Sequence, residues 1–144
     1  MTTLINNAVT AIVSALTSGT PVCSQIDRVR LRPVAQGVPL AVAVRPVQSE
    51  VVQFQLSSLP VSWSSTITVE CYAKSGAATA ADVAVDALVE SVYSRLMADP
   101  TLGGVVVSLQ PKGVSFDFDA DGEHTTCASV VFQVLHRSVG ATLS

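Results

Sequence analysis

The sequence predicts a single α+β domain over residues 1–144, with a mostly antiparallel sheet of about five to six strands and two helices packed on one face of it. Three observations lead to this prediction. Apolar residues recur at helical spacing near the N-terminus and again in the middle of the chain. Elsewhere apolar and polar residues mostly alternate. The chain has 144 residues, of which 49% are hydrophobic, so it is long enough to bury one core.

The first predicted element is a helix of roughly four turns. The segment Ser18-Gly19-Thr20-Pro21 ends it. Its other face is polar but uncharged, so this face can lie against the sheet, a neighbouring molecule or water. The apolar positions lie three or four residues apart at Leu4, Ile5, Ala8, Val9, Ile12, Val13 and Leu16.

The period changes to two between Val22 and Ala73, which predicts strands. Segment 40–44 and segment 51–56 follow as one strand or as a pair of strands. Segment 63–72 is a longer strand whose polar face suits an antiparallel sheet with one side uncovered. The first strand of the block alternates apolar residues with arginines, namely Val29 and Leu31 with Arg28, Arg30 and Arg32.

A second helix of about five turns is predicted from Ala80 onward. Asp82 lies in its first half and Arg95 near its end, where the helix dipole favours each charge. The pair Asp99-Pro100 stops the helix, because a residue before proline is pushed out of the helical region. The apolar stripe consists of Ala81, Val85, Leu88, Val92 and Leu96.

The rest of the chain predicts a short strand and then a hairpin. Residues 105–109 form the short strand, and Pro111-Lys112-Gly113 a turn or bulge. Residues 114–119 alternate, turn at Ala120-Asp121-Gly122 and return as a strand over 125–137. The final residues, about 139–144, lack a pattern and are expected to be loose.

The hairpin register depends on the length of its loop. A three-residue loop with Gly122 in the left-handed conformation would pair Val114 with Ala128 and Phe116 with Thr126. A two-residue loop would move the apolar residues of the first strand to the opposite face. The three-residue loop is preferred because it places the apolar residues of both strands on one face.

Charged residues are scarce and unevenly distributed. They make up 13% of the chain, which has a net charge of −3. Residues 1–74 contain five basic and three acidic side chains, and residues 75–144 contain three basic and eight acidic ones. Halves of opposite sign can pair head to tail between copies, and chance clustering is the alternative. No dense basic patch is present, so sequence-specific nucleic-acid binding is not expected.

The cysteines and the apolar runs indicate the redox state of the thiols and whether the chain contains a membrane span. Cys23, Cys71 and Cys127 are widely spaced and odd in number, which favours reduced, buried thiols over a disulfide framework. The longest uninterrupted apolar run beyond the N-terminus is Val38–Val44, too short for a membrane span. Neither a signal peptide nor a membrane association is expected.

No catalytic, cofactor-binding or metal-binding constellation is recognised, so the chain is not expected to be an enzyme. Residues 117–122 match the opening of an EF-hand loop, but the twelfth position is Ala128 instead of glutamate. A hairpin turn is therefore favoured over a weak cation site. His124 and Cys127 have a spacing seen in metal sites, but residues three apart on a strand point to opposite faces, so these two are not expected to share a metal ion. His136 is expected to be a half-exposed strand residue, and no G-x-S-x-G elbow is present.

The order of elements, helix, strand block, helix, short strand and hairpin, carries a family resemblance. The second helix closes on LMADPTLGGV (96–105), and the last strand ends on VVFQVLHR (130–137). The chain resembles the tail-terminator (tail-completion) proteins of long-tailed bacteriophages. The resemblance spans most of the chain and rests on architecture and on the phrase Asp-Pro-x-Leu-Gly-Gly, which also has the plain role of stopping a helix and turning the chain.

This resemblance implies a structural role in a virion. Members of the family look like subunits of a ring, generally a hexamer, that caps the tail tube, ends tube polymerisation and offers a docking face to the head connector. The implied partners are further copies of the chain, the tail tube protein and the head connector or neck protein, with no cofactor. The implied location is the head-proximal end of the tail, after assembly in the host cytoplasm. The alternatives are another head–tail junction or minor tail protein, or an unrelated small α+β ligand-binding module.

Charge pattern alone suggests interface residues for such a ring. The three arginines of the first strand would face acidic groups on a neighbouring subunit or on a tube ring. The alternative is that both groups are ordinary solvated strand faces and a turn. The residues concerned are Arg28, Arg30 and Arg32 on one side and Asp117, Asp119, Asp121 and Glu123 on the other.

Overall fold

The computed structural model describes residues 3–23, 25–28, 40–54, 61–74, 81–117 and 125–138. These residues form an α+β fold, which confirms the predicted class. The segment 139–144, predicted to be loose, lies outside this set. In chain order the elements are α1 (Leu4–Thr17), β1 (Gln25–Asp27), β2 (Leu40–Phe54), β3 (Val61–Lys74), α2 (Ala81–Met97), β4 (Ser108–Asp117) and β5 (Thr125–Ser138).

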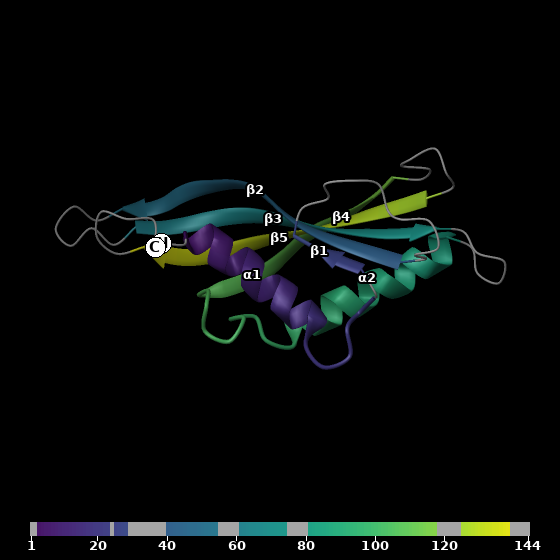
Figure 1. The fold of residues 1–144 in the computed structure, drawn as a ribbon. Coiled ribbons are helices and arrows are strands. Elements are labelled where there is room, and N and C mark those ends of the chain that lie inside the picture. Colours follow the sequence, from purple (N-terminus) through teal and green to yellow (C-terminus); the bar gives the residue numbers. More distant parts are fainter. Residues whose placement is uncertain are drawn as a thin grey trace.

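The strands form one sheet in the order β1-β2-β3-β5-β4. Strand β1 is parallel to β2, and the other neighbouring pairs are antiparallel. Both helices lie on the same side of the sheet, below it in Figure 1. The sheet therefore has one face under α1 and α2 and one face that neither helix covers, as the sequence predicts.

The core lies between the helices and the covered face. Alternate residues of β3 point toward the helices, and Ile67, Val69 and Cys71 are fully buried there. Phe132 and Val134 of β5 join them on the same face. The helices contribute the apolar stripes predicted from the sequence, with Ala8, Val9, Ile12 and Leu16 from α1 and Val85, Leu88, Val92 and Leu96 from α2.

Helix α1 begins with a cap that the apolar periodicity did not indicate. The Thr3 hydroxyl accepts a hydrogen bond from the backbone N–H of Asn6 at 3.2 Å. This bond satisfies one of the donors that the first turn of a helix leaves unpaired. The helix ends at Thr17, so the Ser18-Gly19 stop is confirmed, and Gly19 adopts a positive φ of 66°.

Helix α2 ends in a turn that Asp99 organises. Its carboxylate accepts hydrogen bonds from the backbone N–H and hydroxyl of Thr101, at 3.2 and 2.8 Å, and from the N–H of Gly103 at 2.7 Å. Leu102 takes a left-handed φ of 51° and is 8% exposed. Gly103 and Gly104 also adopt positive φ values, which glycine allows without a steric cost.

Of the two alternatives left open for segments 40–44 and 51–56, the structure has the single strand: β2 runs through both as far as residue 54, with irregular pairing near Val47 and Val52. The short strand predicted over residues 105–109 needs correction. Residues 105–107 do not start a strand, because the Asp99 turn continues through them: the N–H of Val106 bonds the carbonyl of Thr101 at 3.1 Å. Strand β4 starts at Ser108 and runs past a bulge between Pro111 and Gly113.

The predicted hairpin register was also wrong, by two residues. Val114 pairs with Val130, and Phe116 pairs with Ala128. The predicted face is confirmed, because a two-residue shift leaves every side chain on the same side of the pleat. The strand predicted over Arg28–Arg32 lies mostly outside the described residues, and β1 is a short strand just before it.

Candidate functional site

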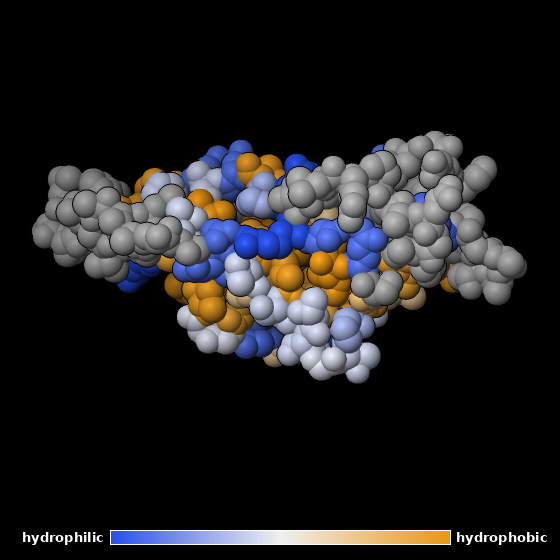
Figure 2. Space-filling model, viewed as in Figure 1, coloured by the Kyte–Doolittle hydropathy of each residue, from blue (hydrophilic) through white to orange (hydrophobic). Residues whose placement is uncertain are grey.

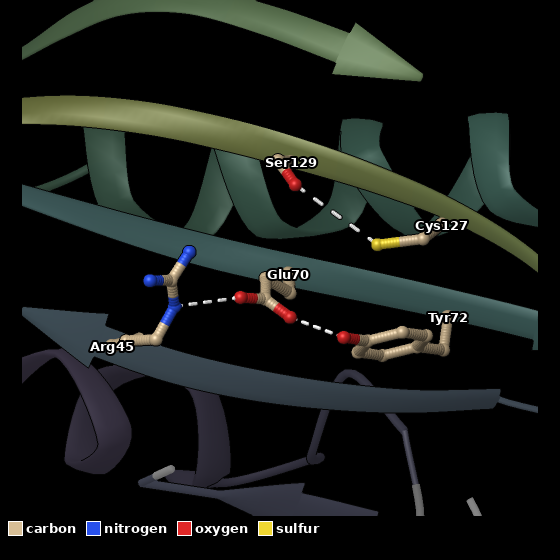
Figure 3. A network of polar contacts seen from close by, with 5 residues as sticks. All are labelled: Arg45, Glu70, Tyr72, Cys127 and Ser129. Carbon is tan, nitrogen blue, oxygen red and sulfur yellow. Dashed lines mark hydrogen bonds and ion pairs between the residues drawn. The ribbon is translucent and has the colours of Figure 1, made fainter. Parts of the chain in front are cut away.

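The uncovered face of the sheet carries a charged hydrogen-bond network (Figure 3). Arg45 of β2 donates from Nε to Oε1 of Glu70 on β3 at 2.8 Å, and Tyr72 donates its hydroxyl proton to Oε2 of the same carboxylate. The Arg45 side chain is 50% exposed, whereas Glu70 is only 14% exposed. The carboxylate is thus paired at both oxygens, and the guanidinium reaches solvent.

On β5, the residues of this face from Cys127 to Gln133 are neutral. Cys127 is 8% exposed and its Sγ lies 4.0 Å from the Ser129 hydroxyl. Burial raises the pKa of the Cys127 thiol, so it stays protonated at neutral pH. Gln133 donates from its side-chain amide to the Ser64 hydroxyl. Among the described residues, this face therefore combines hydroxyl and amide groups with two exposed guanidinium groups, those of Arg45 on β2 and Arg137 at the end of β5, a composition suited to recognition more than to nucleophilic attack.

A polar chain lies on the covered face at the end of the sheet where β5 finishes. Ser49 and Ser65 share a hydrogen bond between hydroxyls at 2.6 Å, and Ser65 bonds Nε2 of His136 at 2.6 Å. His136 is 2% exposed, so the expectation of a half-exposed residue was wrong: its strand position points toward the helices. Nearby, Trp63 donates to the Ser138 hydroxyl at 3.0 Å.

Burial limits the chemistry that the hydrogen-bonded set of Ser49, Ser65 and His136 can perform. Burial lowers the pKa of His136, which keeps the imidazole neutral at pH 7. Its Nδ1 is buried and has no hydrogen-bond partner among the described residues. Ser65 is fully buried, so a substrate has no access to its hydroxyl in the folded chain. The serine and histidine thus specify packing between β2, β3 and β5.

The predicted interface residues fall at opposite edges of the sheet. Arg28 follows β1, is exposed, and donates a hydrogen bond to the Asn6 side chain of α1. Asp117 is the last residue of β4 and is also exposed. Because β1 and β4 are the two edge strands, these residues do not meet within one chain. The remaining predicted interface residues, Arg30, Arg32, Asp119, Asp121 and Glu123, lie outside the described residues.

The β4 edge exposes apolar side chains that the sequence pattern placed on the same face as the apolar residues of β5. Val114 is 45% and Phe116 52% exposed, although their ladder partners Val130 and Ala128 are buried. The apolar face thus continues past the cover of α2 onto the edge strand. Pro111 in the same strand signals an edge, because proline cannot donate to a strand on its far side.

Two hollows open on the helical side of the molecule. One of about 300 Å³ lies by the β1 edge and is lined by Thr3, Ile5, Asn6, Val9, Arg28 and Pro46. A larger groove of about 730 Å³ runs between α1 and the Asp99 turn, with Thr10, Ser14, Arg95 and Val105 among its lining. The polar, uncharged face of α1 therefore lines this groove. The sequence alone did not decide whether this face lies against the sheet, a neighbouring molecule or water.

Figure 2 shows a hydrophilic band crossing the visible side at the level of the sheet, with hydrophobic surface below it at the level of the helices. In the described part of the chain, no group of three or more His, Cys, Asp or Glu is placed to hold a metal ion. None of the described helices has the length and apolarity needed to cross a bilayer.

Comparison with known proteins identifies the fold. No protein-family model matches the chain, and no curated protein is similar to it in sequence. A solved structure does match. It is a chain from the virion of a native gene transfer agent particle, with a TM-score of 0.57, and the similarity covers 90% of this chain and 94% of that chain. Sequence identity is 11%, so the match shows a shared fold over nearly the whole length of both chains.

Proposed function

We propose that this protein is a structural component of a phage-like virion, and that it forms a ring that caps the tail tube, ends tube polymerisation and offers a docking face to the head connector. The observation that carries the proposal is the fold shared with a chain of the gene transfer agent virion over 90% of the present chain. The element order and the helix-stop phrase that resemble tail terminators supply the finer assignment.

The geometry of the sheet supports a ring. Its edges are unlike, because β1 is a three-residue parallel strand and β4 a ten-residue antiparallel one. A contact between the two edges of different copies is heterologous, and repeated heterologous contacts close into rings when the rotation fits. The polar groups described above are paired or buried, so we assign the protein a structural role without a catalytic step.

Two other functions remain candidates. The first is a different head–tail junction protein or a minor tail protein. The shared fold supports this assignment equally well, and such a protein would differ in the ring to which it binds. A ligand-binding module is favoured by the groove of about 730 Å³ between α1 and the Asp99 turn, a volume typical of small-molecule sites.

Native mass spectrometry and electron microscopy of the protein, alone and mixed with tail tubes of its own phage, separate these candidates. The proposal predicts rings in solution or density bound to one end of the tubes, and no binding to tubes of an unrelated phage. Binding along tube walls, or to isolated connectors only, would reassign it within the virion. A monomer that binds neither tubes nor connectors would overturn the proposal.

A further inference from the structure

We propose that neighbouring copies join by adding strand β4 of one copy to the free outer edge of β2 on the next, in an antiparallel register that places Asp117 opposite Arg45. This inference rests on the proposed ring and names its interface. The partner is a second copy, because the two edges lie at opposite sides of one sheet and complement each other in length, direction and charge.

Both edges have backbone groups available for another strand. Strand β1 pairs only with residues 41–43 of β2, so none of the described strands lies against the outer side of β2 beyond them. Strand β4 is the last strand at the other side of the sheet, and no described strand lies beyond it. The free stretches, 45–54 and 108–117, have the same length. An exposed strand edge of this kind is a template for pairing with another chain.

Strand directions and bulges set the register. Strands β2, β3, β5 and β4 alternate in direction, so β4 of one copy runs antiparallel to β2 of a copy placed beside it with its helices on the same side. Val47 in β2 and Lys112 in β4 are extra residues at bulges and take no place in the ladder. Starting from Arg45 opposite Asp117, side chains of the uncovered face then meet one another along the whole seam.

The positions of two prolines agree with this register. A proline fits in a strand where its nitrogen faces the unpaired edge, so Pro46 and Pro111 mark the face of the pleat whose backbone groups point outward. Ser49 and Val114 lie on that same face in their strands, and the register places them opposite each other. Outward backbone groups of the two strands therefore meet, and each proline removes only one donor from the ladder.

The register also brings opposite charges together at two levels. Arg45 and Asp117 are exposed residues of the uncovered face. A guanidinium carries five N–H donors, and Arg45 uses Nε on a carboxylate of its own chain, so it can also bind Asp117 of the next copy. Further along the seam, Glu50 comes opposite the bulge that contains Lys112, and both side chains are exposed. Two such pairs fix the register and the choice of partner.

Apolar side chains lie along the other side of the same seam. Val51 of β2 is 52% exposed and Val114 of β4 is 45% exposed. Both are on the helix-covered side of the pleat, where their ladder partners are Trp63 and Val130. In the proposed register the two valines are diagonal neighbours, and Pro111 lies opposite Val51. Pairing thus removes from water two valines that a single copy leaves exposed.

The stagger between copies is compatible with a closed ring. Within one chain Arg45 is level with Gly113. Pairing Arg45 with Asp117 instead shifts each copy by the four residues from Gly113 to Asp117 for every four strands, β2, β3, β5 and β4, that it adds. With a rise of about 3.3 Å per residue and about 4.8 Å between strands, this shift tilts the strands by about 35°. Closed sheets in proteins have strand tilts of about 35–45°.

Charge reversal tests the pair of Glu50 and Lys112. Lys112→Glu alone and Glu50→Lys alone should each raise the protein concentration needed for half assembly by about tenfold, because like charges then meet at every contact. A single chain with both changes should assemble like the wild type, and so should an equimolar mixture of the single variants, since alternation around a ring places opposite charges at every contact. Asp86→Lys, an exposed change on α2, is the matched control.

Cysteine cross-linking tests the register itself. Gln48 and Ser115 are exposed on the uncovered face and come opposite each other across the seam. Within one chain they lie on strands separated by three strand spacings, about 14 Å, which is too far for a disulfide. A chain with Gln48→Cys and Ser115→Cys should form disulfide-linked oligomers on mild oxidation. Gln48→Cys with Gln110→Cys, which is out of register, should not.

Assembly is measured by native mass spectrometry and by capping of tail tubes, and circular dichroism melts confirm that each variant folds. If the wild type forms rings or caps, but the charge variants assemble equally and the paired cysteines stay unlinked, this interface is wrong and the proposed function stands. Dimers linked through Ser115→Cys alone would assign β4 to a two-fold contact and also overturn it. If the wild type forms neither rings nor caps, the proposed function itself fails.

Discussion

At the scale of single residues, burial in the fold determines the protonation behaviour of ionisable side chains more than their neighbours in the sequence do. His136 shows this at the end of β5, where it is 2% exposed and bonded to Ser65. Burial lowers its pKa, so the unfolded chain binds a proton at higher pH than the folded chain does. Stability at this site is therefore complete above the unfolded pKa of about 6.5 and decreases as the pH falls below it.

Chemical denaturation between about pH 5 and 8, a window around the ordinary histidine pKa of about 6.5, checks this directly. The free energy of unfolding of the wild type should decrease toward acid within the window, and His136→Gln should reduce that slope. Asp99 also titrates, with a pKa below its usual value, and so loses its stabilising contribution at lower pH. An unchanged slope in His136→Gln would contradict the assignment.

The cysteines give a second test at the residue scale. Burial raises the pKa of the fully buried Cys71 thiol to about 12, whereas Cys23 is only half-buried. Alkylation depends on the thiolate, so iodoacetamide at about pH 8 should label Cys23 well before Cys71 in the folded protein. Peptide mapping by mass spectrometry measures both rates, with labelling in denaturant as the reference. Equal rates in the folded protein would show that Cys71 is not held in the core.

At the scale of elements, Arg95 joins the C-terminal ends of the two helices. Its guanidinium donates to the backbone carbonyls of Ala15, Ser18 and Thr20 at 3.1, 2.9 and 2.7 Å. The carbonyls at the end of a helix lack partners within it, and a cation there also complements the helix dipole.

Removal of this side chain should destabilise the fold. Arg95→Ala is expected to lower the free energy of unfolding by about 1–2 kcal/mol, allowing for partial exposure of the hydrogen bonds. Arg95→Lys should recover part of the loss, because an ammonium donates to fewer carbonyls in fixed geometry. Denaturant titration measures both, with Arg137→Ala on the exposed surface of β5 as control. A loss in Arg95→Ala no larger than in the control would contradict this role.

The turn at Asp99 is a second feature that holds the elements together, because it fixes the chain that leaves α2. Its carboxylate bonds Thr101 and Gly103, and the turn carries Leu102 into the core. Asp99→Ala should lower the melting temperature more than Asp82→Ala, an exposed change in the first turn of α2. Thermal melts at neutral pH compare the two variants. Equal melting temperatures would mean that the backbone alone holds the turn.

The helices and long strands are the parts of the fold that sequence periodicity is sufficient to predict. Both helices and the long strands follow from periodicity, because one face of each is buried in a common core. The start of β4 could not be found this way, since residues 105–107 are apolar but held in a turn by Val106 and Thr101. The hairpin register was missed because a two-residue shift leaves the apolar pattern unchanged.

The candidate site was less predictable than the fold. Arg28 and Asp117 were selected from charge alone, and only the strand order shows that they lie at opposite edges. The exposure of Val114 and Phe116 depends on where α2 stops covering the sheet, which no local pattern encodes. The network of Arg45, Glu70 and Tyr72 depends on a pairing between strands.

At the scale of the whole molecule, the helices leave two unlike surfaces for partners. One face of the sheet is uncovered and carries the Arg45–Glu70 pair, and the edges differ in length, direction and apolar exposure. A subunit of this form can contact its own copies through its edges while a face remains for a second kind of partner. This division of surfaces suits a ring located between a tail tube and a connector.

The most direct measurement is tube growth in the presence of the protein. Tail tube subunits of the same phage are polymerised on tail initiators with and without it, and the tube ends are imaged by electron microscopy. If the protein caps the tail tube, we expect an additional ring at the growing end and no further elongation after it binds, while tubes without the protein continue to grow. Tubes that elongate equally in both samples, with unchanged ends, would contradict it.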